Sequence, residues 1–221
     1  MNIEITLPDE SVRTYEKAIT GEEIAFDIGP KLGKDAVAIE INRKLYDTSY
    51  VITENASIKI LTKKDIQSLS ILRHSSAHLL AQAVLNLYPD TLYGVGPDIE
   101  DGFYYDFLFK ENISDADLPK IEKEMLKLSK ANQQFTKSTQ AKSNAMELFK
   151  NQQFKMELID SADETEGVED SEVSLYSNNE FIDLCRGPHV PNTSFIKHFK
   201  LTRLGGAYWR GDENNSQLQR I

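Results

Sequence analysis

Residues 66–87 carry the sequence IQSLSILRHSSAHLLAQAVLNL, which contains neither glycine nor proline and predicts one long helix. At about 100° per residue, its leucines form a stripe on one side, and a second apolar group lies on the opposite side. A helix that is apolar on two sides is buried on two sides, so we expect it at the centre of a domain. His74 and His78 belong to the second group, and both should face the interior or a pocket.

The segment before this helix predicts a small β-rich domain. Thr20 and Glu23 have the spacing of a capping box, which indicates that a short helix begins there. Alternation of apolar and polar residues marks the strands. The expected elements are strands at residues 3–7, 12–16, 37–41, from 45 onward and at 58–62, with the short helix after Thr20. This order is that of a β-grasp, ubiquitin-like fold.

A short polar joint, Lys63-Lys64-Asp65, divides the chain into a domain at residues 1–63 and a second at 64–221. Together with the long helix, the later segments predict an α+β domain in which that helix lies against a mostly antiparallel sheet. Its other expected elements are a strand at 102–107, helices near 117–131 and 141–149, a strand at 154–159, an exposed acidic loop, and strands at 173–176 and 181–185.

Composition limits the classes of function. The 25 basic and 35 acidic residues give a net charge of −10, which argues against binding of long nucleic acids by charge alone. Residues 155–172 hold eight acids, whereas residues 173–221 have a local balance of +2 and could form a basic site. The single cysteine, Cys185, excludes an internal disulfide framework and fits a reducing cytosol. With neither a signal peptide nor an apolar run of roughly 18–20 residues, a cytoplasmic protein without membrane contact is expected.

Two short motifs of equal spacing carry the candidate chemistry, His74-x3-His78 and Cys185-x3-His189. On a helix, a separation of four places both imidazoles on one face, within reach of a shared metal, water or substrate. The second pair spans Gly187-Pro188, so it is expected at a strand end followed by a tight loop. Alternation along that strand puts Asp183 and Cys185 on the same face.

Residue types and spacing leave two site chemistries open. The first is a zinc site, with two histidines from a helix and a Cys/His pair from a loop as four ligands. The zinc site would be structural if all four residues bind the ion, and it could be hydrolytic if three bind and water takes the fourth position. The alternative is metal-free hydrolysis, in which a histidine activates water. A hydrogen-bonded core pair of histidines and a buried apolar cysteine would be the purely structural interpretation.

The sequence resembles a known family at both ends. ITLPDESVRTYE at residues 5–16 and AFDIGPKLGKDAVAIEINRKLYD at 25–47 resemble a TGS domain, found in threonyl-tRNA synthetases, some GTPases and stringent-response enzymes. No Walker-type phosphate loop follows, which excludes the GTPases for this chain. RHSSAHLLA, GFYYD, DLCRGPH and GGAYWRGD, in that order from residue 73 to 212, resemble the N-terminal half of bacterial threonyl-tRNA synthetases.

The resemblance implies hydrolysis of mischarged seryl-tRNA(Thr), while the full-length enzyme attaches threonine to tRNA(Thr) with ATP. The histidine–cysteine set is also similar to that of alanyl-type editing domains, which bind zinc, whereas the threonyl family works without metal. Two alternatives therefore stay open: a zinc-dependent alanyl-type editing hydrolase, or a non-enzymatic TGS and zinc interaction module. No cofactor is expected for this region; the ATP, magnesium and zinc of the family belong to a catalytic core that the chain lacks, as it lacks the anticodon-binding domain.

Side-chain chemistry suggests roles for single residues, and for Lys155 and Tyr104 the resemblance implies them. His74 is the expected base and His78 its orienter, and Cys185 shapes the pocket rather than attacking the substrate. Asp183 is expected to bind the substrate ammonium, and His189 to bind the terminal ribose or water. Lys155 is expected to stabilise charge, and Tyr104 to line the pocket. A surface lysine at a strand start is the alternative for Lys155.

The expected partner is tRNA(Thr), chiefly its acceptor end, with a homodimer for the full-length enzyme and a monomer for this region. Four basic residues alternate with aromatic residues near the C-terminus, a combination suited to phosphates and unstacked bases. They are Lys197, Lys200, Arg203 and Arg210. A lysine stripe in residues 120–130 is a second candidate, although Glu122 and Glu124 in the same segment favour a solvated face.

Overall fold

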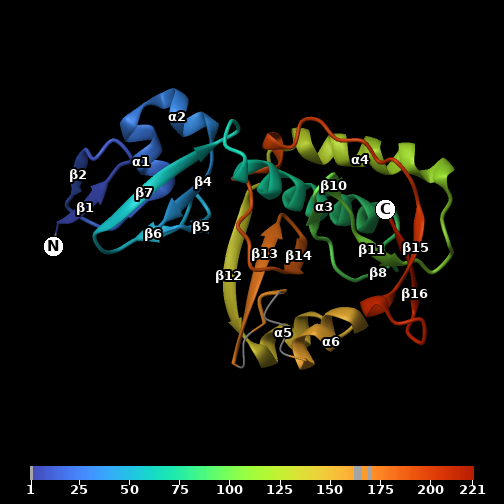
Figure 1. The fold of residues 1–221 in the computed structure, drawn as a ribbon. Coiled ribbons are helices and arrows are strands. Elements are labelled where there is room, and N and C mark those ends of the chain that lie inside the picture. Colours follow the sequence, from blue (N-terminus) through green and yellow to red (C-terminus); the bar gives the residue numbers. More distant parts are fainter. Residues whose placement is uncertain (1, 162–165, 169–170) are drawn as a thin grey trace. The chain divides into compact units, whose positions relative to one another are not determined.

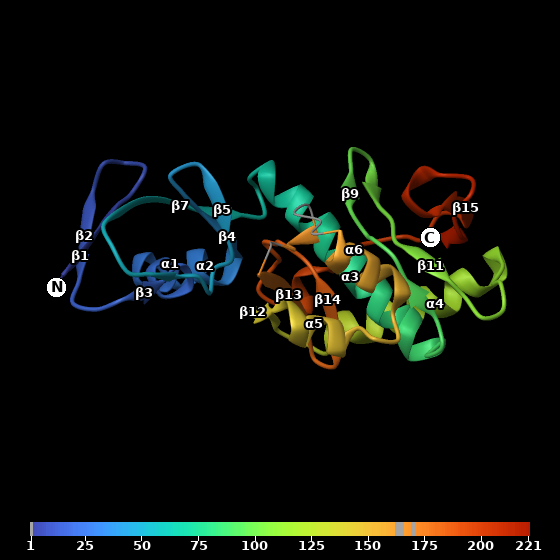
Figure 2. The ribbon, with the colours of Figure 1, turned by 90° about the horizontal axis from the view of Figure 1, so that it is seen from below.

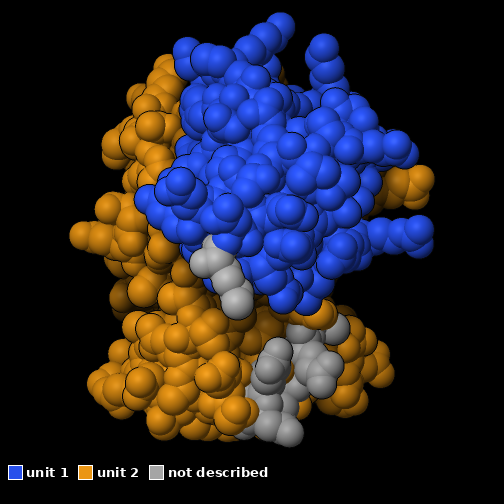
Figure 3. Space-filling model, turned by 90° about the vertical axis from the view of Figure 1, so that its left-hand side faces the viewer, with its two compact units in different colours: residues 1–72, 187–191 blue, residues 73–186, 192–221 orange. Residues whose placement is uncertain are grey.

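The computed structural model describes residues 2–161, 166–168 and 171–221, which fall into two compact units (Figure 3). Unit 1, blue in Figure 3, comprises Met1–Leu72 and the short segment Gly187–Pro191. Unit 2, orange, comprises Arg73–Arg186 and Asn192–Ile221. Unit 1 is therefore supplied by two stretches of chain that are far apart in sequence.

Unit 1 is built on a five-stranded sheet (Figure 1). Its strands lie in the order β2 (Val12–Tyr15), β1 (Ile3–Thr6), β7 (Ala56–Thr62), β4 (Ala36–Ile41) and β5 (Lys44–Tyr46). β1 and β7 pair in parallel, and the other neighbours pair antiparallel. The ribbon of β3 (Ile19–Thr20) and β6 (Val51–Ile52) and the helices α1 (Gly21–Ile28) and α2 (Pro30–Asp35) complete the unit. The predicted β-grasp fold is confirmed.

The core of unit 1 joins isoleucines of the strands to Ile24 of α1, and Ile5, Ile24 and Ile39 are fully buried. Each such side chain contributes about 1.5–3 kcal/mol. At the start of α1, a Cβ on Gly21 would lie 2.5 Å from Cγ2 of Ile39, so only glycine allows this approach. The predicted capping box of Thr20 and Glu23 is present. Helix α2 was not predicted; it starts with Pro30 at its first position, directly after Gly29.

Unit 2 is organised around α3 (Gln67–Leu87), of which residues 67–72 are grouped with unit 1. Leu79, Leu80 and Val84 are fully buried, which confirms a central helix that is apolar on more than one side. The buried amide of Gln82 is satisfied within the unit, because it exchanges hydrogen bonds with Asn178 and donates one to Gln133.

Antiparallel sheets lie beside α3 in unit 2 (Figures 1 and 2). The four-stranded sheet has the order β15 (Gly205–Tyr208), β16 (Gln217–Arg220), β11 (Asp106–Leu108) and β8 (Leu92–Tyr93). The three-stranded sheet has the order β12 (Phe135–Ala141), β13 (Glu172–Asn178) and β14 (Phe181–Leu184), and β9 (Asp98–Ile99) pairs with β10 (Gly102–Phe103). The helices are α4 (Leu118–Lys130), α5 (Lys142–Leu148) and α6 (Gln153–Asp160), with 3-10 turns at Asp115–Asp117, Thr193–Phe195 and Trp209–Gly211.

The strand prediction for residues 154–159 was wrong, because these residues form α6. Phe154, Leu158 and Ile159 are buried, and this spacing is that of one helix face. Strands β8, β9, β12, β15 and β16 were not predicted. β12 is mostly exposed and polar, so it has no apolar alternation. The acidic stretch that was predicted as a loop begins within α6 and falls in part on residues 162–165 and 169–170, which lie outside the described residues.

Candidate active site

Helix α3 carries the two motif histidines one turn apart on one side. The ring centroids of His74 and His78 are 5.0 Å apart, at an interplanar angle of 68°. His78 is 2% exposed and packs edge-on against Phe181 of β14, whereas His74 is only half-buried. His74 is therefore the ring that a substrate or water reaches more easily.

The end of β14 brings a thiol and a carboxylate to these histidines. Sγ of Cys185 lies 3.0 Å from Nε2 of His74, and Oδ2 of Asp183 lies 3.9 Å from Nε2 of His78. Asp183 and Cys185 thus meet the same face of α3, as the alternation along the strand predicted. His74, His78 and Cys185 are called the histidine–cysteine cluster below.

A buried lysine completes the surroundings of Asp183. Lys155 of α6 has no exposed surface, and its Nζ forms an ion pair with Asp183 and donates to the hydroxyl of Tyr105 at 3.1 Å. That hydroxyl donates to Oδ2 of Asp183 at 2.5 Å. The alternative of a surface lysine is excluded. These three residues, Lys155, Tyr105 and Asp183, are called the buried lysine network below. The network pairs one positive and one negative charge in the interior, where an unpaired charge would be costly.

Tyr105, and not the predicted Tyr104, belongs to this network. The ring of Tyr104 instead packs under the guanidinium of Arg220, at 3.7 Å from its centroid. A Cβ on Gly96 would lie 2.1 Å from Cδ2 of Tyr105, so a glycine there is needed for the ring to reach Asp183. Adjacent residues of an extended segment point to opposite sides, and this signal could have limited the choice to one of the two tyrosines. A substrate contact by Tyr104 stays a prediction.

Burial governs the protonation of the site. It lowers the pKa of His74, although Asp98, Asp183 and a hydrogen bond to the Gly96 backbone act in the opposite direction. Burial, with smaller contributions from His74 and Lys155, lowers the pKa of His78 further below 6.5. Both imidazoles are therefore neutral near pH 7, and each retains a nitrogen that can accept a proton.

His189, the fourth motif residue, lies in the segment Gly187–Pro191, which is part of unit 1. It is 1% exposed, and its backbone N–H donates to Oδ1 of Asp47 at 2.9 Å. The described structure of unit 2 therefore brings together three of the four motif residues, and the convergence of all four stays a prediction.

The histidine–cysteine cluster could hold a metal ion. One ligand atom from each of its three residues lies within 4.8 Å of the others. Two imidazole nitrogens and a thiolate suit zinc, at about 2.0–2.1 Å for nitrogen and 2.3 Å for sulfur. Their side chains would have to close in slightly around the ion, and Cys185 would have to lose its proton.

Two family models match the sequence on either side of these motifs. The model of the TGS domain matches residues 3–62, and that of the threonyl and alanyl tRNA synthetase second additional domain matches residues 173–221. The threonine–tRNA ligase of Hahella chejuensis is 49% identical over 219 residues, which cover 98% of this chain and 34% of the relative. Those of Francisella tularensis subsp. novicida and Acholeplasma laidlawii are 47% and 46% identical over 99% of this chain, and over 34% and 33% of their own lengths. The chain is similar to threonine–tRNA ligases over nearly its whole length. It spans about a third of the length of these relatives and carries the sequences that match both domain models.

The basic residues near the C-terminus that were predicted to contact tRNA are all exposed. Lys200 pairs with Glu122 at 2.8 Å, and Arg210 donates to Oγ of Ser161 at 2.9 Å. The four residues are Lys197, Lys200, Arg203 and Arg210. The lysines of the α4 stripe, Lys120, Lys123, Lys127 and Lys130, are exposed as well.

The aromatic residues near them differ in accessibility. Tyr208 is 44% exposed and open to a base, whereas Trp209 is 4% exposed. The Trp209 ring packs against Phe154, and its N–H donates to Glu157 at 2.6 Å. Trp209 is thus a core residue, and the interleaved pattern in the sequence overstated the stacking surface.

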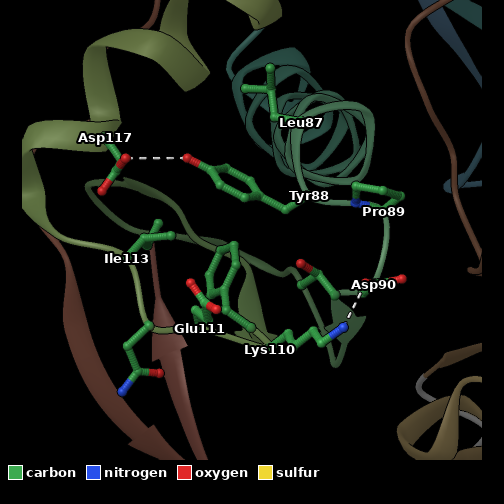
Figure 4. Close-up of a pocket in the computed structure, with 11 residues that line it drawn as sticks. Leu87, Tyr88, Pro89, Asp90, Lys110, Glu111, Ile113 and Asp117 are labelled. Atoms are coloured by element: carbon green, nitrogen blue, oxygen red, sulfur yellow. Dashed lines mark hydrogen bonds and ion pairs between the residues drawn. The ribbon is translucent and has the colours of Figure 1, made fainter.

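A separate hollow of about 390 Å³ opens beside the C-terminal end of α3 (Figure 4). In Figure 4 the hydroxyl of Tyr88 donates to Asp117 at 3.3 Å, and Lys110 reaches Asp90 at 3.4 Å. Its lining shares no residue with the histidine–cysteine cluster or the buried lysine network. Within the described residues, no helix combines the length and the apolar character that crossing a membrane requires.

Proposed function

We propose that this region hydrolyses the ester bond of seryl-tRNA(Thr), and that the longer protein attaches threonine to tRNA(Thr) with ATP. The observation that carries the proposal is the neutral His74–His78 pair beside Cys185, in a chain similar to threonine–tRNA ligases over nearly all its length. The region would act as a second, hydrolytic selection step after a synthetic site.

Such a step is needed because serine and threonine differ by one methyl group. A missing methyl or methylene costs a ligand only about 1–3 kcal/mol, which limits a synthetic site to roughly 10–200-fold selectivity. A hydrolytic pocket that admits serine and excludes the extra methyl of threonine removes the error.

His74 acts as the general base in this proposal. Its ring is half-buried, so a water molecule can reach it, and its lowered pKa keeps it unprotonated near pH 7. The water oxygen attacks the ester carbonyl carbon while its proton passes to the imidazole. The bond from carbon to ribose oxygen then breaks, and the ribose oxygen takes up the proton, leaving free serine and tRNA. His78, one turn along α3, orients His74.

Cys185 shapes the pocket, with Sγ 3.0 Å from Nε2 of His74, rather than attacking the substrate. A nucleophilic cysteine needs a thiolate, which a protonated imidazole or another cation stabilises. The lowered pKa of His74 disfavours that imidazolium.

The buried lysine network supplies fixed charge. Lys155 is held by Asp183 and Tyr105, and we assign it the stabilisation of negative charge that develops on the ester carbonyl oxygen. Asp183 attracts the substrate ammonium by its field, since its oxygens already contact Lys155 and Tyr105. His189 binds the terminal ribose or the water, and Tyr104 lines the entrance.

We propose that this hydrolysis needs no metal. The base is an unprotonated imidazole, so water can be activated without a Lewis acid. A zinc-dependent hydrolase is the second candidate, favoured by the three ligand atoms that lie within 4.8 Å of one another.

The substrate tRNA is proposed to contact the exposed Lys197, Lys200, Arg203 and Arg210 through phosphates of its acceptor end. The longer protein is proposed to act in the cytoplasm as a homodimer, and this region by itself as a monomer.

A deacylation assay tests the proposal. Seryl-tRNA(Thr) and threonyl-tRNA(Thr) are incubated with the 221-residue chain, with and without a chelator, and zinc is measured by elemental analysis. Fast loss of serine in both conditions, with threonine spared, is the expected result. Loss of activity on removal of one tightly bound zinc would favour the second candidate, and no hydrolysis of either ester would reject both.

A further inference from the structure

The segment Gly187–Pro191 packs as part of unit 1, although it lies inside the sequence that matches the second additional domain. His189 and Val190 are 1% and 0% exposed. A buried backbone N–H without water needs an acceptor from the protein, so the position of His189 depends on what accepts its N–H.

That acceptor is a carboxylate of the TGS domain. The N–H of His189 donates to Oδ1 of Asp47 at 2.9 Å, across 142 positions of sequence. Hydrogen bonds to an ionised acceptor are roughly twice as strong as bonds between neutral groups, and their loss leaves a buried donor unsatisfied. This contact therefore fixes the His189 backbone more firmly than apolar packing alone.

Asp47 is itself held by the fold of unit 1. It follows β5, and its carbonyl accepts the N–H of Tyr50 at 3.1 Å to close a turn. Inside the turn, the carbonyl of Thr48 accepts the N–H of Glu22 at the start of α1 at 2.8 Å. The rings of Tyr46 and Tyr50 pack with centroids 4.3 Å apart across the turn. The carboxylate is thus presented by a turn that is anchored to a strand and a helix.

We propose that Asp47 is a positioning residue for His189, so that the TGS domain contributes to the hydrolytic reaction by holding one of its motif residues. The anchoring rests on the contacts above. Its effect on hydrolysis rests on the proposed function and on the assignment of His189 from the Cys185-x3-His189 motif. The two parts therefore need separate measurements.

Three variants separate the carboxylate from general damage to the domain. Asp47→Ala removes the acceptor, and Asp47→Asn keeps an acceptor oxygen at nearly the same place. Asp27→Ala is the matched control, because Asp27 is an exposed aspartate of the same unit whose partners are Arg13 and Tyr15.

Hydrogen exchange of the His189 backbone amide tests the anchoring independently of hydrolytic activity. The chain has four histidines, so labelling with 15N-histidine gives four backbone amide signals in the intact 221-residue protein. Asp47→Ala should raise hydrogen exchange of the His189 amide at least about tenfold, while Asp47→Asn and Asp27→Ala stay near wild type. Unchanged exchange in Asp47→Ala would overturn the anchoring.

Single-turnover hydrolysis of seryl-tRNA(Thr) tests the functional part. Asp47→Ala should lower the rate constant by about 10–100-fold with little change in the tRNA concentration at half-saturation, since about 1 Å of misplacement costs on the order of 100-fold. Asp47→Asn should restore most of the rate. If Asp47→Ala frees the His189 amide but hydrolyses at the wild-type rate, the positioning role is wrong. If the wild-type chain hydrolyses nothing, the proposed function fails while the exchange result still stands.

Discussion

Replacing Lys155 by methionine would leave Asp183 as a buried and uncompensated carboxylate. Lys155 is 0% exposed and Asp183 is 1% exposed, so water cannot take over the role of the ammonium group. Breaking a buried pair by removing one partner costs about 3–5 kcal/mol. With a urea dependence of about 2 kcal/mol per molar, the unfolding midpoint of unit 2 should fall by about 1.5–2.5 M.

The single tryptophan makes this loss measurable in unit 2 alone. Trp209 packs on Phe154, the neighbour of Lys155 in α6, whereas unit 1 contains no tryptophan. Its fluorescence in urea therefore follows unit 2. Lys150→Met is the matched control, because Lys150 forms an exposed ion pair with Glu147 and such pairs contribute little.

The double variant Lys155→Met with Asp183→Asn should recover at least half of the lost stability, because the neutral amide needs no counter-charge and can still accept from Tyr105. The reasoning would be refuted if Lys155→Met unfolded at the wild-type urea concentration with an unchanged slope, or if the double variant were less stable than the single one.

Further predictions concern pH, the thiol and the tRNA contacts. Burial lowers the pKa values of His74 and His78, so below about pH 6.5 the unfolded chain takes up protons that the folded protein does not. The free energy of unfolding should therefore rise with pH below about pH 6.5, by up to about 1.4 kcal/mol per pH unit for each histidine. Chemical denaturation at several pH values measures this rise. For the same reason, the acidic limb of the hydrolysis rate should lie below pH 6.5. Cys185→Ala should retain measurable hydrolysis in a deacylation assay, with no covalent intermediate trapped in the wild type; complete loss with a trapped thioester would assign the thiol as nucleophile. Arg203→Ala should weaken binding of seryl- and threonyl-tRNA alike in filter binding, and an effect on only one ester would contradict a phosphate contact.

The parts of the structure with strong periodicity could be predicted from the sequence. The β-grasp domain follows from alternation and the Thr20 capping box, and α3 follows from an uninterrupted apolar pattern. That His74 and Cys185 each point toward the site follows from the side-chain periodicity of the helix and of the strand. By contrast, β12 was missed because its side chains are mostly exposed and polar, and its pairing with β13 depends on backbone contacts that sequence patterns do not report.

The buried lysine network could not be predicted from spacing. Lys155 is buried because a carboxylate and a tyrosine hydroxyl from distant parts of the chain compensate it, and α6 was taken for a strand. Tyr104 and Tyr105 are neighbours of one type, so only the packing beside Gly96 decides which one turns inward. Likewise, Asp47 lies 142 positions from the amide it binds, with no motif to connect them.

The most direct test of the chemistry is the single-turnover rate of seryl-tRNA(Thr) hydrolysis by wild type and His74→Ala, measured with enzyme in excess. A general base acts in the transition state, so His74→Ala should lower the rate constant by about 10²–10⁴-fold while tRNA binding stays near wild type. Removal of a merely packed imidazole would instead change stability and leave the rate of the folded protein intact. An unchanged rate constant in folded His74→Ala would contradict the assignment of His74 as the base.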